Sequence, residues 1–201
     1  MNYEENQAFI NAVEKANEIL KSNDFPVPIR EMIEGDPDVE LLTFFEFARI
    51  TGIRLSEVAG VGQSDEAFHF RKGNKAVVVY NTLKYIKRAR FTLAHEYGHI
   101  KMGHQGTSIY DTTGSNSIYT REEFEADTFA GALLFPLHMR YACKDKSTYE
   151  IANAFNLSFK AVRVCMYQFR RHMSLGLEKH LTSYQHRLPD SYINFLREHS
   201  Y

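Results

Sequence analysis

The residues with the clearest chemical potential lie in the segment Ala94–His99, which reads AHEYGH. His95 and His99 are four residues apart, so on a helix they project from the same face, one turn apart. Two imidazole nitrogens placed in this way can bind one Zn²⁺ at about 2.0–2.1 Å. Glu96 lies beside the pair, where its carboxylate can take a proton from a water molecule that the metal activates. The pattern therefore predicts a zinc site for peptide hydrolysis, with Glu96 as the general base. The alternative is a surface turn with two solvated histidines.

A catalytic zinc ion keeps three protein ligands and one open position, so the two histidines need a further partner. His104 is poorly placed for this role, because a continuing helix would put it about 180° around the axis from His95. We expect His104 to face solvent or to support a ligand from behind. The segment TREEFEADTFAGALLFP offers a better candidate, since Glu123 and Asp127 are four residues apart and share one face of a predicted helix.

The pair Glu123 and Asp127 resembles the second half of the gluzincin arrangement, in which the Glu binds zinc and the Asp accepts the N–H of a ligand histidine. The same stretch allows a second interpretation. Thr120 and Glu123 have the spacing of a capping box, in which Glu123 would bond to the backbone of Thr120 rather than to a metal. In that case Glu122 or Glu125 would supply the ligand, so three neighbouring carboxylates remain candidates.

These residues need elements that hold them in place, and the hydrophobic pattern predicts several. Helical spacing and stop signals predict helices over residues 4–21, 36–50, 86–102 and 121–135, two short ones within 147–171 and a short one after Pro189. Two β-rich runs joined by Lys72-Gly73-Asn74 predict a hairpin over residues 66–80, preceded by a strand at 53–58. The Gly-, Ser- and Thr-rich stretch 105–119 is typical of a mobile loop.

The composition is that of an ordinary globular protein and argues against several classes. The 201 residues carry a net charge of −1, so no overall charge attracts the chain to nucleic acid or to an acidic membrane. The N-terminal segment has no basic region of the kind that begins a signal peptide, and no apolar stretch reaches the roughly eighteen residues of a transmembrane helix. Cys143 and Cys165 lack the spacing of a metal or disulfide motif. We therefore expect a cytoplasmic protein with reduced thiols.

Two motifs taken together, RARFTLAHEYGHI and EEFEADTFAGALLFP, resemble the ImmA/IrrE family of zinc metallopeptidases, and the likeness covers roughly residues 20–140. The resemblance implies that His95, His99 and Glu123 bind zinc. It also implies that Glu96 is the general base and that Asp127 orients a ligand histidine. Members of the family are intracellular, and those best understood cleave helix-turn-helix repressors to release transcription. A protein substrate of this kind is therefore implied, with no membrane partner.

Two further roles stay open at this point. In zincin folds an edge strand beside the active helix pairs with extended substrate backbone, so the hairpin either binds substrate by strand addition or only covers the helix. A donor that stabilises the developing oxyanion would come from Tyr97, His104, Tyr110 or Tyr119, and their spacing does not decide among them.

The segment STYEIANAFNLSFKAVRVCMYQF has the spacing of a helix-turn-helix, with a turn at residues 156–158. Arg163, Arg170 and Arg171 lie on or just after its second helix, where contacts with DNA phosphates would be made. This suggests an alternative function, a DNA-binding or toxin–antitoxin regulatory protein whose metal site is not catalytic. Because the basic residues are few and the chain is nearly neutral, packing or substrate docking is favoured over direct nucleic-acid binding.

The sequence thus predicts an α+β chain with a zincin-like domain over residues 1–140 and a helical, helix-turn-helix-like extension over residues 141–201. The domain should combine a small antiparallel sheet with an active-site helix. Its expected function is zinc-dependent cleavage of a regulatory protein, a helix-turn-helix repressor, in the cytoplasm.

Overall fold

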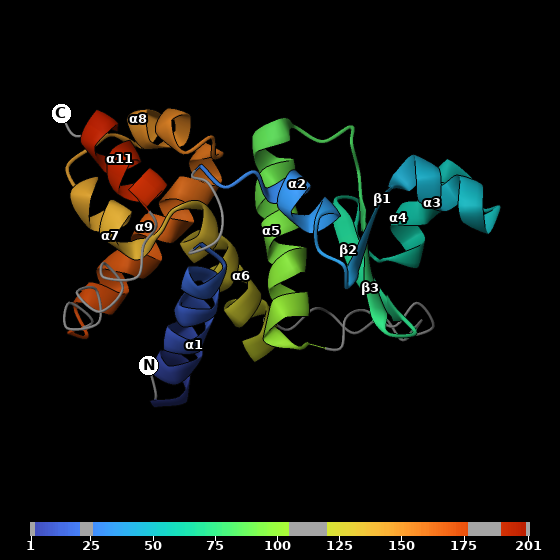
Figure 1. The fold of residues 1–201 in the computed structure, drawn as a ribbon, viewed down its shortest axis with the longest axis horizontal. Coiled ribbons are helices and arrows are strands. Elements are labelled where there is room, and N and C mark those ends of the chain that lie inside the picture. Colours follow the sequence, from blue (N-terminus) through green and yellow to red (C-terminus); the bar gives the residue numbers. More distant parts are fainter. Residues whose placement is uncertain (1–2, 21–25, 105–119, 177–189, 200–201) are drawn as a thin grey trace. The chain divides into compact units, whose positions relative to one another are not determined.

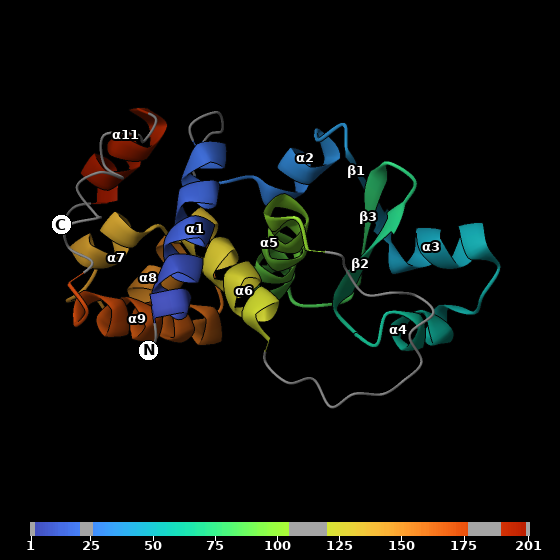
Figure 2. The ribbon, with the colours of Figure 1, turned by 90° about the horizontal axis from the view of Figure 1, so that it is seen from below.

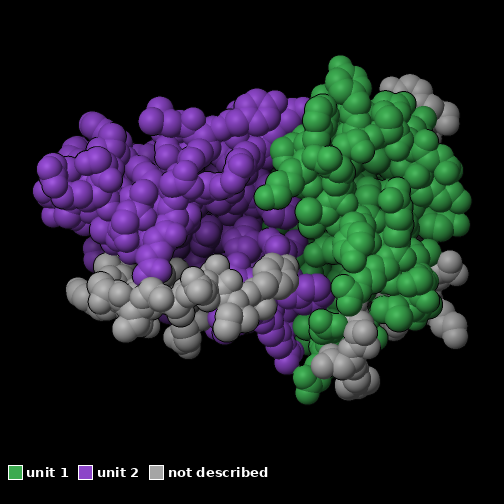
Figure 3. Space-filling model, turned by 180° about the vertical axis from the view of Figure 1, so that it is seen from behind, with its two compact units in different colours: residues 1–28, 128–201 green, residues 29–127 purple. Residues whose placement is uncertain are grey.

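The computed structural model describes residues 3–20, 26–104, 120–176 and 190–199, which form an α+β fold (Figure 1). The chain divides into two compact units, coloured separately in Figure 3. Unit 1 combines residues 1–28 with residues 128–201, and unit 2 comprises residues 29–127, so unit 2 is inserted within unit 1 along the chain. The α+β class predicted from the sequence is confirmed, whereas the domain boundary near residue 140 stays a prediction.

Unit 2 is built around a three-stranded sheet with the strand order β1-β3-β2. β2 (Ala67–Lys72) and β3 (Lys75–Tyr80) form the predicted hairpin and pair antiparallel. β1 (Val39–Thr43) pairs in parallel with the other side of β3, so the sheet is mixed rather than antiparallel throughout. Residues 76–80 of β3 are all buried, as expected of a central strand that is covered on both faces.

Helices cover the two faces of this sheet. α3 (Phe44–Thr51) and the short α4 (Val58–Val61) pack on one face, where Phe47, Phe68 and Val79 belong to one apolar cluster. α5 (Ile86–Met102) contacts β2 and β3 and receives the side chain of His69, which alternates along β2 with Phe68 and Phe70. α2 (Ile29–Glu34) contacts α5 and β1. The alternation of faces along β2 therefore turns one histidine toward the helix that carries the metal motif.

The single helix predicted over residues 36–50 is wrong in its first half, because residues 39–43 form strand β1 and α3 begins at Phe44. Thr43 marks the junction between them. Its hydroxyl accepts a hydrogen bond from the Glu46 backbone N–H at 3.1 Å, and the Glu46 carboxylate accepts one from the Thr43 backbone N–H at 2.7 Å. This capping box starts the helix directly after the strand, because it satisfies backbone donors at the helix N-terminus.

The strand predicted at residues 53–58 is also wrong. The chain there forms a turn of 3₁₀-helix at Leu55–Glu57 and continues into α4. The Glu57 carboxylate accepts hydrogen bonds from the backbone N–H of Arg54 at 3.1 Å and from its guanidinium, which closes a helical turn locally. Leu55 is exposed, so the apolar alternation in this stretch does not reflect a buried sheet face.

Unit 1 is helical in the part that the structure describes (Figure 2). Its helices are α1 (Tyr3–Leu20), the second half of α6 (Arg121–Leu134), α7 (Leu137–Ala142), α8 (Thr148–Ala154), α9 (Phe159–Met173) and α11 (Asp190–His199). All but α7 were predicted from the sequence. In α7 the fully buried Arg140 donates to the carbonyl oxygens of Phe135 at 2.6 Å and Cys165 at 3.2 Å, which ties α7 to the end of α6 and to α9.

Within the described ranges, no helix combines the length and the apolar character that crossing a bilayer requires.

Candidate metal centre

Helix α5 presents His95, Glu96 and His99 from its second half, as the four-residue spacing predicts. The helix ends at Gly103, whose backbone has a left-handed φ of 81° and whose N–H donates to the carbonyl of Ile100 at 3.1 Å. Glycine suits this position because a side chain disfavours positive φ. The next residue, His104, is thereby turned back and becomes buried beside the helix.

Three potential ligand atoms converge from two helices, the second half of α5 and the first turn of α6. His95, His99 and Glu123 each offer an atom within 4.8 Å of the others. The Nε2 atoms of the two histidines are 3.1 Å apart, and they lie 3.3 Å and 3.4 Å from the two carboxylate oxygens of Glu123. A tetrahedral zinc ion bound at about 2.0–2.2 Å would hold its ligand atoms about 3.3–3.6 Å apart. The donor set therefore fits a small divalent metal ion in both chemistry and spacing.

The structure distinguishes between the three candidate carboxylates of α6. Glu122 is exposed, and Glu125 bonds elsewhere, so only Glu123 joins the two histidines. The predicted capping box is half formed: the Thr120 hydroxyl accepts the Glu123 backbone N–H at 3.2 Å, while the Glu123 carboxylate turns to the histidines. The backbone of Glu123 thus starts the helix, and its side chain is left available for a metal.

Each of the two histidines makes a hydrogen bond through Nδ1, the ring nitrogen that does not face Glu123. His95 Nδ1 lies 2.9 Å from Asp127 Oδ1. His99 Nδ1 lies 2.9 Å from Nδ1 of His104, whose Nε2 lies 3.0 Å from the Glu125 carboxylate. A carboxylate only accepts, so His95 donates from Nδ1 to Asp127 and His104 donates from Nε2 to Glu125. Nδ1 of His104 then accepts from His99, so in the neutral form both His95 and His99 can present the lone pair of Nε2 to a metal ion.

His104 was expected to face solvent or to support a ligand; it is buried and contacts His99, so solvent exposure is excluded and the supporting role stays a prediction. It is 7% exposed, and Glu125, which it contacts, is held in turn by Arg121 at 2.9 Å. The sequence alone does not reveal this position, because it depends on the turn at Gly103 rather than on helical spacing.

The charges of His95, His99 and Glu123 influence one another's protonation. Burial by itself would lower the pKa of His95, but its hydrogen bonds to Asp127 and Glu123 outweigh burial and raise that pKa to about 10. The same contacts with His95 and His99 hold the pKa of Glu123 far below its usual range. Negative charge therefore gathers where a cation would bind, and in the metal-free state a proton on His95 partly balances it.

Glu96 is not one of the three converging residues, and one of its carboxylate oxygens contacts the sheet. Its Oε2 lies 2.6 Å from Nδ1 of His69, and both side chains are buried. Sequence reasoning did not single out His69. One sign was available in the sequence: His69 lies between Phe68 and Phe70 in a β-rich run. Because side chains alternate between the two faces of a strand, His69 must point to the face opposite the two phenylalanines.

The structure also bears on the candidate oxyanion donors. The Tyr97 hydroxyl donates to Asp36 at 2.7 Å, and Lys101 pairs with the same carboxylate at 2.5 Å, so Tyr97 anchors α5 to the segment before β1. His104 is bonded to His99 and Glu125. Tyr110 and Tyr119, like the whole predicted loop at 105–119, lie outside the described residues.

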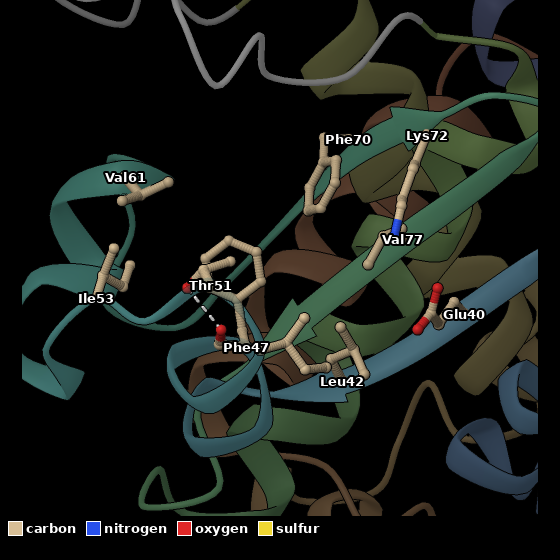
Figure 4. A pocket seen from close by; sticks show the side chains of 10 residues that line it. Glu40, Leu42, Phe47, Thr51, Ile53, Val61, Phe70, Lys72 and Val77 are labelled. Atoms are coloured by element: carbon tan, nitrogen blue, oxygen red, sulfur yellow. Dashed lines mark hydrogen bonds between the residues drawn. The ribbon is translucent and has the colours of Figure 1, made fainter.

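A pocket of about 370 Å³ lies on the other face of the sheet, between the strands and helices α3 and α4 (Figure 4). Its walls are largely apolar, with Phe47 and Phe70 prominent and with Glu40 and Lys72 as charged members. Phe70 points away from the His69 face of β2, so this pocket is separate from the metal centre.

Comparison with known proteins finds a protein family whose sequence profile matches this chain. The sequence profile described as the IrrE N-terminal-like domain, of the peptidase M78 group, matches residues 48–166. The matched region contains β2, β3, α5 and α6, and so all residues of the candidate metal centre. A comparison with curated proteins found no match.

Proposed function

The chain belongs to the family of IrrE N-terminal-like peptidases, and on this premise we propose that it is an intracellular zinc-dependent endopeptidase that cleaves a regulatory protein. The observation that carries the proposal is the convergence of ligand atoms from His95, His99 and Glu123. Glu96 adjoins this set, and in the described part of the chain its Oε1 accepts no hydrogen bond. Metal-assisted hydrolysis requires both parts, a ligand set and a free basic oxygen beside it.

The proposed roles follow from the geometry. When bound, zinc lowers the pKa of a water ligand to about 7 and polarises a carbonyl oxygen. Glu96 accepts the proton of the attacking water on Oε1 and later delivers it to the leaving amine. Asp127 keeps the ring of His95 in the orientation and tautomer that expose Nε2, and His104 does the same for His99.

The site offers an edge at which a substrate backbone can bind. In the described sheet β2 is an edge strand, and it is also the strand whose His69 contacts Glu96. We propose that an extended substrate segment adds to the free edge of β2 by backbone hydrogen bonds. This favours the first of the two roles considered for the hairpin, substrate pairing in addition to covering α5.

The identity of the substrate is a separate proposal. The resemblance to the ImmA/IrrE family supports a helix-turn-helix repressor, whose cleavage would release transcription, and a cytoplasmic location. The test is to incubate the zinc-loaded protein with the helix-turn-helix repressor encoded nearest to its own gene, and to identify new termini by mass spectrometry. Cleavage by the wild type but not by Glu96→Gln is the expected result.

One observation favours an alternative, a DNA-binding regulatory protein with a non-catalytic metal site. The exposed side of α9 carries Lys160, Arg163 and Arg170 and no acidic residue. If this alternative holds, a Lys160→Ala/Arg163→Ala variant should bind duplex DNA more weakly than the wild type, with a smaller salt dependence. Equal, weak binding by both proteins contradicts it.

The first experiment concerns the metal itself. Elemental analysis of the purified protein should find about one zinc per chain in the wild type, and far less in His99→Ala, because one ligand atom is lost. Glu96→Gln should keep its zinc, since Glu96 is not a ligand. The absence of metal from all three proteins, after loading with Zn²⁺, would overturn the proposal.

The second experiment asks for peptide hydrolysis without assuming a substrate. A peptide library prepared from digested yeast proteins is incubated with zinc-loaded wild type or Glu96→Gln, and new peptide ends are identified by mass spectrometry. We expect cleavage by the wild type and a loss of at least about 100-fold in the variant, in the range that general-base catalysis contributes. Equal cleavage by both proteins would remove Glu96 from its proposed role.

A further inference from the structure

The side chain of His69 is enclosed between the sheet and α5. It lies in the middle of β2, opposite Val78 of the central strand, and is 4% exposed. Its ring stacks on that of His99, with centroids 5.0 Å apart and planes inclined by 26°. One imidazole therefore touches a proposed metal ligand with its face and the proposed general base with its edge.

The direction of the hydrogen bond between His69 and Glu96 follows from their chemistry. The ionised carboxylate has no proton to give, so Nδ1 of His69 donates and Oε2 of Glu96 accepts, at 2.6 Å. Nε2 of His69 is buried, and no described residue bonds to it. The contact thus selects the tautomer with the proton on Nδ1, and it occupies one carboxylate oxygen while leaving the other available.

Without a hydrogen-bond partner, the side chain of Glu96 would not have a fixed orientation at this position. Glu96 follows a metal ligand directly in sequence, and its carboxylate adds to the negative charge around His95. Beside a divalent cation, a carboxylate with free side-chain torsions is drawn to the metal, where it would fill the position that hydrolysis keeps open. A fixed donor on a buried strand prevents this by holding Oε2 on the side of the sheet.

We propose that His69 is a positioning residue for Glu96, which holds the carboxylate off the metal and aims Oε1 at the attacking water. The inference rests on the proposed peptidase function. It assigns to β2 a task distinct from substrate pairing, because the side chain of His69 acts on the inner face while the strand edge remains free.

Two variants separate the hydrogen bond from the packing of the ring. His69→Phe keeps an aromatic ring against His99 but has no donor, whereas His69→Asn loses the ring but can place its amide N–H near the former Nδ1. Using the best peptide from the library, we expect His69→Phe to lower kcat by about 10- to 100-fold, as for changes behind a metal ligand, with little change in KM. His69→Asn should recover a large part of that loss. Zinc content should stay near one per chain in both.

A matched control is His172, a second buried histidine, which belongs to unit 1, stacks on Phe9 and contacts the carbonyl oxygen of Gln168. His172→Phe should lower thermal stability without lowering kcat per folded molecule. If His69→Phe has the kcat of the wild type, or if His69→Asn is no better than His69→Phe, the inference is overturned.

A spectroscopic measurement tests the contact without any substrate. Two-bond ¹H–¹⁵N spectra of the imidazoles report which nitrogen carries the proton, and the signal of His69 is assigned by its absence from His69→Phe. We expect the proton on Nδ1 in the wild type, with and without zinc, and a shift toward Nε2 in Glu96→Ala. A proton on Nε2 in the wild type would contradict the inference. Because this readout needs neither metal nor cleavage, it separates failure of the inference from failure of the proposed function.

Discussion

Glu123 is one of three glutamates in the first turns of α6, and its neighbours show how much depends on direction. Glu122 is exposed to solvent and Glu125 contacts His104, while Glu123 faces His95 and His99. The three side chains have the same chemistry and differ only in their angle around the helix. A change at each of them should therefore have a different effect.

We predict that Glu123→Gln weakens zinc binding by more than about 100-fold, the upper end for residues that act behind a ligand, because it removes a charged ligand atom. Glu122→Gln, one residue earlier, should bind zinc like the wild type. Competition with a chelating dye measures both affinities. Similar affinities for the two variants would mean that Glu123 is not a ligand.

His138 of α7 provides a pH-dependent test of the fold. Burial lowers its pKa from about 6.5 to about 3, so the folded protein keeps this imidazole neutral over a range in which the unfolded chain protonates it. Because the unfolded state then binds more protons, the free energy of unfolding falls as the pH drops below about 6.5. Relative to His138→Phe, the wild type should lose about 2 kcal/mol between pH 7 and pH 5 in urea titrations. Parallel pH profiles would contradict this assignment.

The residues of the candidate site differ in how far the sequence could predict them. His95, Glu96 and His99 follow from helical spacing, a local property that needs no tertiary information. Glu123 could be narrowed only to one of three carboxylates, because the start of its helix sets the facing side chain. His69 is 27 residues from Glu96 along the chain, and its contact depends on how β2 is placed against α5, which no local pattern encodes.

Among the elements, α3 and α4 show how the same chemical change can have opposite effects. Gly52 follows α3 with a φ of 77°, and Gly60 lies within α4, where no positive φ is needed; a Cβ at either would meet no atom within 4 Å. Only backbone conformation therefore distinguishes the two sites.

Gly52→Ala should lower the free energy of unfolding by about 1 kcal/mol, because a side chain disfavours the left-handed conformation. Gly60→Ala should raise it by about 0.5–1 kcal/mol, because alanine favours helix. Urea denaturation of both variants checks the signs. Effects of the same sign would show that a contact other than backbone strain dominates.

Longer elements were predicted better than short ones. α1, α5, α6 and α9 have several turns, over which the apolar period is repeated often enough to be clear. β1 and α4 have five and four residues, too few for a period of two to be told from one of 3.6. The capping box of Thr43 and Glu46 was the available sign that a helix began at Phe44 and not earlier.

At the scale of the whole chain, the candidate metal centre lies entirely in unit 2, yet α6 runs from unit 2 into unit 1 at residues 127–128. Since helix formation is cooperative, a ligand that fixes the first turns of α6 should also stabilise the turns beyond them. We predict that zinc slows amide hydrogen exchange in α5 and along all of α6, including residues 128–134, but not in α8. Protection that stops at residue 127 would show that the two halves of α6 open independently.

The continuity of α6 also limits how this protein can be divided or recombined. A graft of residues 29–127 into another scaffold would carry every proposed ligand, but it would cut α6 after about two turns. Isolated helices shorter than about 12–15 residues are marginal in water, so Glu123 and Asp127 would sit on a segment that does not hold its shape. The smallest piece that can be transplanted, or inherited by recombination, with its chemistry intact is therefore larger than the compact body that contains the chemistry.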